Sequence, residues 1–110
     1  MMSSITKDIV IKNITGEDLK DIYLTYVGLE KHPFKIANIR KNGQVLKSLF
    51  LNHLRKPTEL KLFYFINDEK NEIIVYDNLD KDDLSRLTLT ISMIDDKLHV
   101  ETTRWRYIDI

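Results

Sequence analysis

Two short apolar runs on either side of a polar segment place the strongest constraint on how this chain can fold. The first run spans residues 60–66, the second spans residues 73–76, and every residue from 67 to 72 is polar. Aromatic and β-branched residues dominate both runs, and such runs around a polar turn are typical of two antiparallel strands. The segment 58–77 therefore predicts a β-hairpin in which Ile66 pairs with Ile73.

The composition favours an all-β fold around this hairpin. Alanine, the best helix former, occurs once, at Ala37, whereas β-branched residues, which lose rotamer freedom in helices, are abundant. With 110 residues, of which 43% are hydrophobic and 31% charged, the chain is long enough to bury a core without disulfides. We therefore expect residues 1–110 to form a single domain.

Alternation of apolar and polar residues places the other strands. The turn Asp95-Asp96 pairs Ile94 with Lys97, so that the apolar positions of the two neighbouring runs share one face. Strands at such short and regular spacing are typical of an antiparallel sandwich or barrel. The predicted strands cover residues 6–14, 22–27, 34–36, 45–51, 60–66, 73–76 and 86–94, with a last strand that begins at residue 97.

The end of the last strand conflicts with its own alternation. Continued alternation would place Arg104 and Arg106 on the core face and Trp105 and Tyr107 on the polar face. A β-bulge near residues 102–103 would reverse the phase. We expect this bulge to turn Trp105 toward the core, and the alternative is that Trp105 and Tyr107 lie on the outer face.

Three segments in the first half of the chain follow one another in a recognisable order. A strand ends in Asn-Ile-Thr-Gly at residues 13–16, the segment 19–24 follows with the start of the next strand, and the segment 36–41 leads into the turn at Asn42-Gly43. Over about residues 9–51 this order resembles the opening of bacterial immunoglobulin-like adhesion and accessory domains, although Asn-Gly stands where those domains have Pro-Gly. The resemblance implies no catalytic residues. It implies an immunoglobulin-like fold, so we expect an antiparallel β-sandwich of about seven or eight strands.

The charge balance argues against nucleic acid or membrane as a partner. The formal net charge is zero, with 17 Lys and Arg against 17 Asp and Glu, whereas binders of nucleic acid or anionic membranes carry a positive excess. The segment 104–107, Arg-Trp-Arg-Tyr, could stack bases and contact phosphates. A terminal edge strand, whose arginines discourage edge-to-edge pairing, is the interpretation that zero net charge favours.

Cysteine usage and the first residues point to the cytoplasm. The chain has no cysteine, which excludes disulfides, thiol catalysis and cysteine-bound zinc. The N-terminal segment lacks the basic start and apolar stretch of a signal peptide, and no run of eighteen apolar residues exists. The triplet Asn13-Ile14-Thr15 matches a glycosylation acceptor, but without a secretion signal we interpret it as coincidence.

Patterns for metal binding are weak throughout. The densest acidic cluster lacks both the glycine and the final glutamate of a calcium loop, and we interpret it as a solvated helical turn, capped by Asp80, whose Leu84 faces inward. The three histidines lack zinc spacing. The residues considered are Asp77, Asp80, Asp82 and Asp83 for calcium and His32, His53 and His99 for zinc.

Patterns for catalysis are equally weak. No serine stands in a nucleophile elbow, and the three glycines are too scattered for a phosphate-binding loop. We expect no metal site, no cofactor and no enzyme. A hydrolase that assembles a histidine beside a carboxylate is the least favoured class.

The hairpin carries more apolar surface than one buried face needs. Its first face would hold Leu62, Tyr64, Ile66, Ile73 and Val75, and its second face Phe63, Phe65, Ile74 and Tyr76. Covered by residues 52–57 or by the C-terminal segment, the second face would belong to the core. Exposed, it would form an apolar patch of roughly a few hundred Å², which marks a partner or dimer surface.

The excess apolar surface and the weak chemical motifs together lead to a functional hypothesis. We expect a small non-enzymatic module that binds a protein partner, or a second copy of itself, through a sheet face. The alternative is a carbohydrate-type ligand module that uses Tyr23, Trp105 and Tyr107 as stacking surfaces. The residues expected to contact a protein partner are Phe63, Phe65, Ile74, Tyr76, Trp105 and Tyr107.

Overall fold

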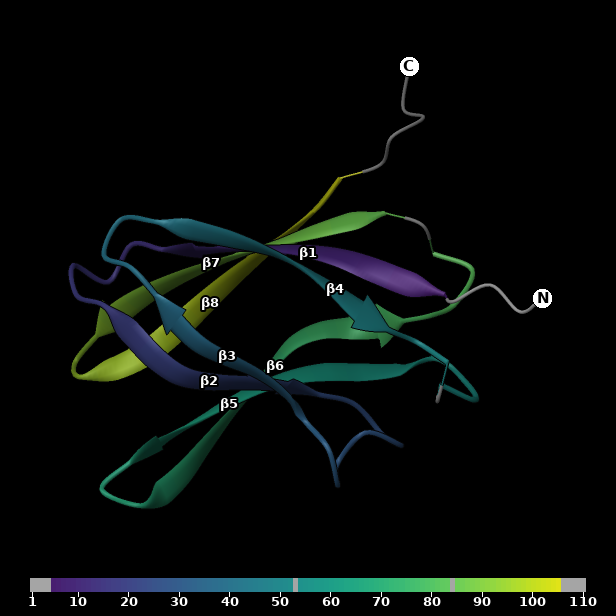
Figure 1. The fold of residues 1–110 in the computed structure, drawn as a ribbon, viewed down its shortest axis with the longest axis horizontal. Helices are drawn as coiled ribbons and strands as arrows, with labels where there is room; N and C mark the ends of the chain where they lie inside the picture. Colours follow the sequence, from purple (N-terminus) through teal and green to yellow (C-terminus); the bar gives the residue numbers. More distant parts are fainter. Residues whose placement is uncertain (1–4, 53, 84, 106–110) are drawn as a thin grey trace.

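The alternating runs of the sequence form eight strands (Figure 1). The computed structural model describes residues 5–52, 54–83 and 85–105, and within these ranges there is no helix. The strands are β1 (Thr6–Asn13), β2 (Leu19–Thr25), β3 (Phe34–Ile39), β4 (Gln44–Phe50), β5 (Thr58–Ile66), β6 (Glu69–Leu79), β7 (Arg86–Ile94) and β8 (Lys97–Trp105).

The strands build two four-stranded sheets that pack face to face (Figure 1). Sheet A has the order β4-β1-β7-β8, and sheet B has the order β3-β2-β5-β6. This confirms the expected all-β fold. The expectation of a purely antiparallel sandwich is wrong at one place, because β1 and β7 run parallel. The segment β2–β6 provides the long crossover that two parallel strands require.

Alternation along the strands builds the core between the sheets. On sheet A, Ile9 and Ile11 alternate with solvent-facing residues, and Leu89 of β7 lies beside Ile11 in the parallel register. Leu24 of β2 and Leu62 of β5 pair on the opposing sheet, and both are fully buried. Each such side chain contributes about 1.5–3 kcal/mol to folding by leaving water.

The hairpin β7–β8 has the expected register but not the expected bulge. Asp95 and Asp96 form a two-residue turn with φ values of 53° and 63°, as a type I′ turn requires. Pairing then continues without a shift from Ile94 and Lys97 to Arg86 and Trp105. The predicted bulge near residues 102–103 is therefore wrong, and Trp105 is 55% exposed on the outer face.

The position of Arg104 explains why no bulge is needed. Regular pairing places Arg104 opposite Leu87, in the core-facing phase of the strand. At the rim of the sandwich its Nη1 atom lies 3.5 Å from the Tyr76 hydroxyl and 3.7 Å from Oδ2 of Asp83. The charge thus finds partners at the edge of the core, so the strand keeps its phase.

The hairpin β5–β6 turns earlier than its polar segment suggested. The turn is Asn67-Asp68, with φ values of 50° and 65°, and Ile66 pairs with Glu69 instead of Ile73. Our expected register is wrong by four residues, because the polar residues 69–72 belong to the strand and not to the turn. The shift is an even number of residues, so it leaves the two faces of the hairpin as predicted near its tip.

A second irregularity moves Tyr76 off the predicted face. Register shifts on either side of Leu60 place Tyr76 opposite Leu60. Tyr76 consequently packs against the core, half-buried, instead of lying beside Phe63. Extra residues in one strand change the facing of every residue beyond them.

A buried asparagine joins two turns at one end of the sandwich. Asn13 is fully buried, and its Nδ2 donates to the carbonyl oxygens of Glu17, Ile39 and Arg40 at 2.7, 3.0 and 3.1 Å. Its Oδ1 accepts from the backbone N and the hydroxyl of Thr15 at 2.9 and 2.7 Å. The glycosylation triplet is thus a structural motif in this fold, since its amide nitrogen is enclosed and occupied.

The segment that follows β6 is a turn and not the expected helical turn. The backbone N of Asp83 donates to the carbonyl oxygen of Asp80 at 3.3 Å, and Asp80 Oδ1 accepts from the backbone N of Asp82 at 3.4 Å. The predicted inward orientation of Leu84 lies outside the described residues. The described part of the chain contains no helix that could span a membrane.

Candidate functional site

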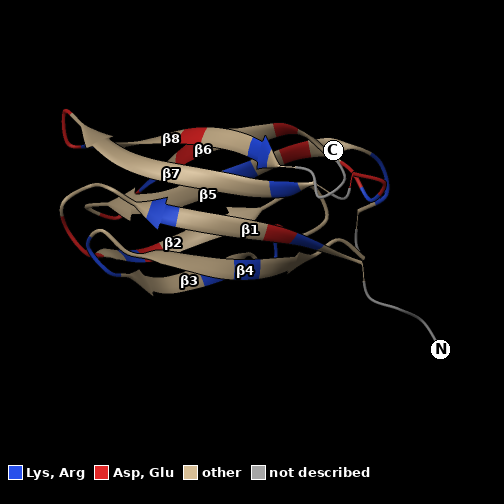
Figure 2. Cartoon of the chain, turned by 90° about the horizontal axis from the view of Figure 1, so that it is seen from above, with Lys and Arg blue, Asp and Glu red and all other residues tan. Residues whose placement is uncertain are grey.

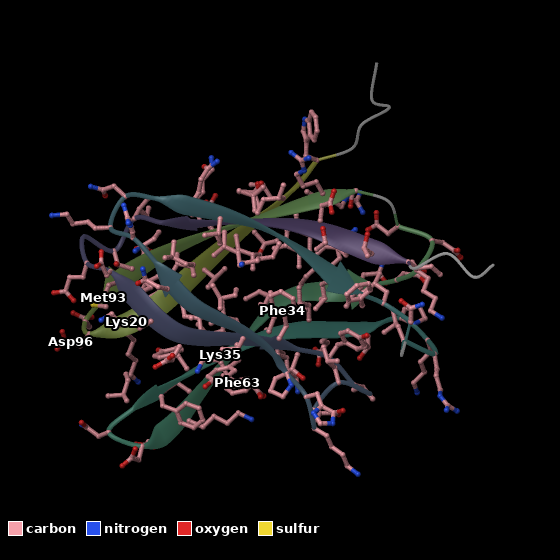
Figure 3. The ribbon with its side chains drawn as sticks, viewed as in Figure 1. Lys20, Phe34, Lys35, Phe63, Met93 and Asp96 are labelled. Atoms are coloured by element: carbon pink, nitrogen blue, oxygen red, sulfur yellow. The ribbon has the colours of Figure 1, made fainter. Side chains whose placement is uncertain are left out.

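The outer face of sheet B gathers the aromatic residues that the sheet does not bury between the layers. In the register of the sheet, Tyr23 of β2 lies between Lys35 of β3 and Phe63 of β5. Phe65 follows two residues further along β5 and therefore points to the same side. Figure 3 labels Lys35 and Phe63, which flank Tyr23 in this sheet.

Three of these rings form a contiguous cluster. The rings of Tyr23 and Phe63 are stacked, with centroids 4.7 Å apart and planes 6° from parallel. The ring of Phe65 stands at 87° to both, at 6.1 Å from Tyr23 and 5.9 Å from Phe63. Stacked and edge-to-face pairs stabilise by about 0.5–1.5 kcal/mol each. We call Tyr23, Phe63 and Phe65 the aromatic cluster.

Lysine side chains border the aromatic cluster. The Lys70 Nζ lies 4.3 Å from the ring centroid of Phe63, and the Lys35 Nζ lies 6.0 Å from that of Tyr23. Both are within the range of a cation–π attraction. Glu72 lies 3.6 Å from Lys70 and 3.5 Å from Lys61. The result is an apolar centre with a rim of both charges.

The six predicted contact residues do not form one surface. Phe63 is only 7% exposed, because neighbouring side chains cover it, whereas Phe65 and Ile74 on the same face are 51% and 54% exposed. Tyr76 lies at the edge of the core. Trp105 belongs to sheet A, with the Arg86 guanidinium 5.6 Å above its ring, and Tyr107 lies outside the described residues. Only Phe63, Phe65 and Ile74 share a face.

A polar network around Lys7, where β1 begins, is a second cluster of ionisable and hydrogen-bonding groups. Lys7 of β1 is almost fully buried, and its Nζ donates to the carbonyl oxygen of Asp83 at 2.9 Å and to the Ser85 hydroxyl at 3.1 Å. The Tyr76 hydroxyl donates to Oδ2 of Asp83 at 2.7 Å. These bonds tie the start of β1 to the segment between β6 and β7.

The ionisation of this network follows from its burial and its charges. Burial lowers the pKa of Lys7, and the nearby Asp83 carboxylate offsets this only in part. Burial acts to raise the pKa of Asp83, but the hydrogen bonds from Ser85 and Tyr76 and the charge of Lys7 outweigh it and hold that pKa well below its usual range. Burial also raises the pKa of Tyr76. The network therefore holds a charged pair at neutral pH.

Sequence reasoning did not predict that Tyr23 packs against Phe63 and Phe65, and it did not predict the polar network around Lys7. Tyr23 joins the cluster only through the pairing of β2 with β5, which no local pattern reveals. Lys7 did carry a signal, because it alternates in phase with Ile9 and Ile11 and therefore falls on the core face. A lysine in that phase requires a buried partner.

The histidines and acidic residues do not assemble into a metal site in the described part of the chain. His32 and His99 are exposed, the first in a loop and the second on β8. Among the described residues no group of three or more histidine, aspartate or glutamate side chains could hold a metal ion. Positive and negative residues are interspersed over both sheets (Figure 2).

Comparison with known proteins bears on the fold alone. No family model matches this chain, and no curated protein does. The chain is similar to a solved structure described as the NMR structure of a protein from Eubacterium rectale. The two are 14% identical, with a TM-score of 0.58, and the match covers 96% of this chain and 94% of that one. The likeness thus extends over nearly the whole two-sheet fold.

Proposed function

We propose that this domain is a small, non-enzymatic, cytoplasmic interaction module that binds a protein partner, or a second copy of itself, through the outer face of sheet B. The observation that supports this most is the exposure of Phe65 and Ile74 on the face that holds the aromatic cluster. Exposed apolar side chains around a rigid aromatic centre are typical of protein contact surfaces.

The layout of this face fits a protein better than a sugar. An apolar centre with a charged rim is the usual anatomy of a protein interface, and here Lys70, Lys61 and Glu72 supply the rim. A sugar needs an open ring face, whereas Tyr23 stacks on Phe63. Trp105, the second ring of the carbohydrate alternative, lies on the other sheet.

The immunoglobulin-like character is part of the same proposal. Two packed four-stranded sheets from about one hundred residues, with the chain crossing between the sheets, support a relationship to immunoglobulin-like sandwiches. Such sandwiches commonly serve as binding scaffolds.

Substitution of one exposed side chain tests the proposed surface. We would compare the unmodified domain with Phe65→Asp and with the control Leu46→Asp, because Leu46 is 57% exposed on strand β4 of the other sheet. Sedimentation over a range of concentrations detects self-association, and quantitative co-purification from the source cells detects other partners. We expect Phe65→Asp to lose an association that Leu46→Asp keeps. A monomer whose co-purifying proteins are the same in all three forms would contradict the proposal.

A further inference from the structure

Three loops meet at the end of the sandwich opposite the turns 67–68 and 95–96. They follow β2, β4 and β6, and all three lie toward the right of Figure 1. A cleft of about 580 Å³ opens between them, lined by Gly28, Asn52, Leu54, Arg55 and Lys81. We call it the loop cleft.

The loop cleft is lined by two positive charges and no negative one. Arg55 and Lys81 come from different loops, and neither forms an ion pair with another described residue. Two carboxylates stand beside lining residues, and each accepts a backbone hydrogen bond: Glu30 from the N of Gly28 at 2.6 Å, and Asp80 from the N of Asp82 at 3.4 Å; neither of them lines the cleft itself. The cleft is therefore suited to an anion.

An apolar groove adjoins the loop cleft. This groove has a volume of about 570 Å³ and shares Asn52 with the cleft. Its other lining residues include the rings of Phe34 and Phe50, from the edge strands β3 and β4, together with Leu29, His32 and Pro33. We call it the edge groove.

The backbone of Phe50 is held in place at this groove, and its ring is open to solvent. The ring is 55% exposed, while the carbonyl oxygen of the same residue accepts a hydrogen bond from the buried Tyr26 hydroxyl at 2.8 Å. The backbone at Phe50 also pairs with Thr6 of β1. An exposed aromatic ring on a fixed backbone, beside a volume of this size, is a surface on which a flat molecule can stack.

We propose that the loop cleft and the edge groove together bind one small molecule that carries a phosphate group and a planar ring, as a mononucleotide does. Arg55 and Lys81 contact the phosphate, whose charge near −2 at neutral pH matches the two cations, and the arginine fork suits its oxygens. The ring lies in the edge groove against Phe50. Asn52, which lines both volumes, stands where the two parts of the ligand join.

The proposal is independent of the interaction surface on sheet B. None of the loop-cleft residues belongs to the aromatic cluster, and the edge groove shares with the border of that cluster only Lys35, which neither test replaces. Failure of one proposal therefore leaves the other open to its own test. The combination of a volume of several hundred Å³, apolar walls and few convergent polar groups is typical of small-molecule sites.

Titrations with three probes test the two parts separately. Inorganic phosphate, adenosine and adenosine monophosphate would be added to the ¹⁵N-labelled domain at constant ionic strength, and amide shifts would be followed by NMR. We expect adenosine monophosphate to bind at least about tenfold more tightly than phosphate alone, because it occupies both volumes. The shifts should map to residues of both loops and to the start of β3. Equal affinity for the three probes, or shifts confined to another face, would overturn the proposal.

Variants with a matched control assign the contacts. Arg55→Gln and Lys81→Gln should each weaken binding of phosphate and of the nucleotide about fivefold, whereas Lys56→Gln, an exposed lysine of the same loop that does not line the cleft, should change it less than twofold. Phe50→Ala should weaken the nucleotide and leave phosphate unchanged. Dispersed spectra show that each variant is folded. Nucleotide binding that Arg55→Gln and Lys56→Gln weaken equally would refute the assigned site.

Discussion

The Lys7 Nζ lies 3.5 Å from Oδ2 of Asp83, although 76 residues separate the two in the chain. Lys7 is 1% exposed, so its ammonium group has lost nearly all contact with water. A buried charge needs a partner far more than a solvated one does. The pair therefore fixes the position of the segment before β7 against the start of β1. The two partners differ in burial, because the side chain of Lys7 is 1% exposed and that of Asp83 is 15% exposed.

Replacing Asp83 should destabilise the folded domain more than replacing Lys7 does. Asp83→Asn leaves the buried Lys7 ammonium without its counter-charge and should lower the free energy of unfolding by about 3 kcal/mol or more. Lys7→Met keeps the volume, and Asp83 keeps its hydrogen bond from Tyr76, so the loss should be roughly half as large. Urea denaturation measures both values. Equal losses in the two variants would contradict this account.

The same pair should make the domain sensitive to acid. The pKa of Asp83 is lowered below its ordinary value of 3.8, so the folded state holds the proton less readily than the unfolded chain. Its contribution to stability is therefore complete above about pH 5 and is lost as the pH falls through 3.8 toward the folded pKa. Unfolding free energies measured between pH 5 and pH 2 should fall more steeply for the unmodified domain than for Asp83→Asn. Parallel curves for the two proteins would show that a group other than Asp83 causes the loss of stability in acid.

Asn13 should tolerate no substitution that removes its amide nitrogen. Asn13→Asp replaces a donor to three carbonyl oxygens with a carboxylate oxygen that repels them. We expect a loss of roughly 3 kcal/mol or more in the free energy of unfolding. Asn38→Asp makes the same chemical change at an exposed position of β3 and should change stability by less than about 0.5 kcal/mol. Thermal unfolding of both variants provides the comparison.

Trp105, the single tryptophan of the chain, reports whether β8 is regular to its end. Because its side chain is 55% exposed, its fluorescence emission in the folded domain should already lie close to that of the unfolded chain. Acrylamide should quench it with similar efficiency in both states. A strongly blue-shifted emission would place the ring inside the core and would revive the bulge near residues 102–103.

Local sequence patterns were sufficient to locate the strands, but they were not sufficient to predict how every strand pairs with its neighbour. The register of β7 and β8 followed from Asp95-Asp96, because a two-residue turn fixes every pair beyond it. Asn67-Asp68 carries the same chemistry, but the four polar residues after it suggested a longer turn and led to the wrong pairing of Ile66. Hydrophobicity alone does not distinguish a polar strand end from a loop.

The candidate site was predictable only in part, for a related reason. Phe63, Phe65 and Ile74 share a face because residues on one hairpin alternate, which sequence reveals. Tyr23 reaches Phe63 through the pairing of β2 with β5, and Arg55 and Lys81 line one cleft from two different loops. These contacts depend on topology, which the sequence encodes only through the packing of the whole core.

The parallel pairing of β1 with β7 has a consequence for the order in which the chain can assemble. Ile9 lies beside Leu87, so one side of the first strand stays without its partner until more than three-quarters of the sequence has been synthesised. Loops of that length close slowly, and folds rich in such distant contacts acquire their native state late. During synthesis on a ribosome, sheet B has all its strands before sheet A does, and β1 remains a half-paired edge until β7 emerges to enclose it.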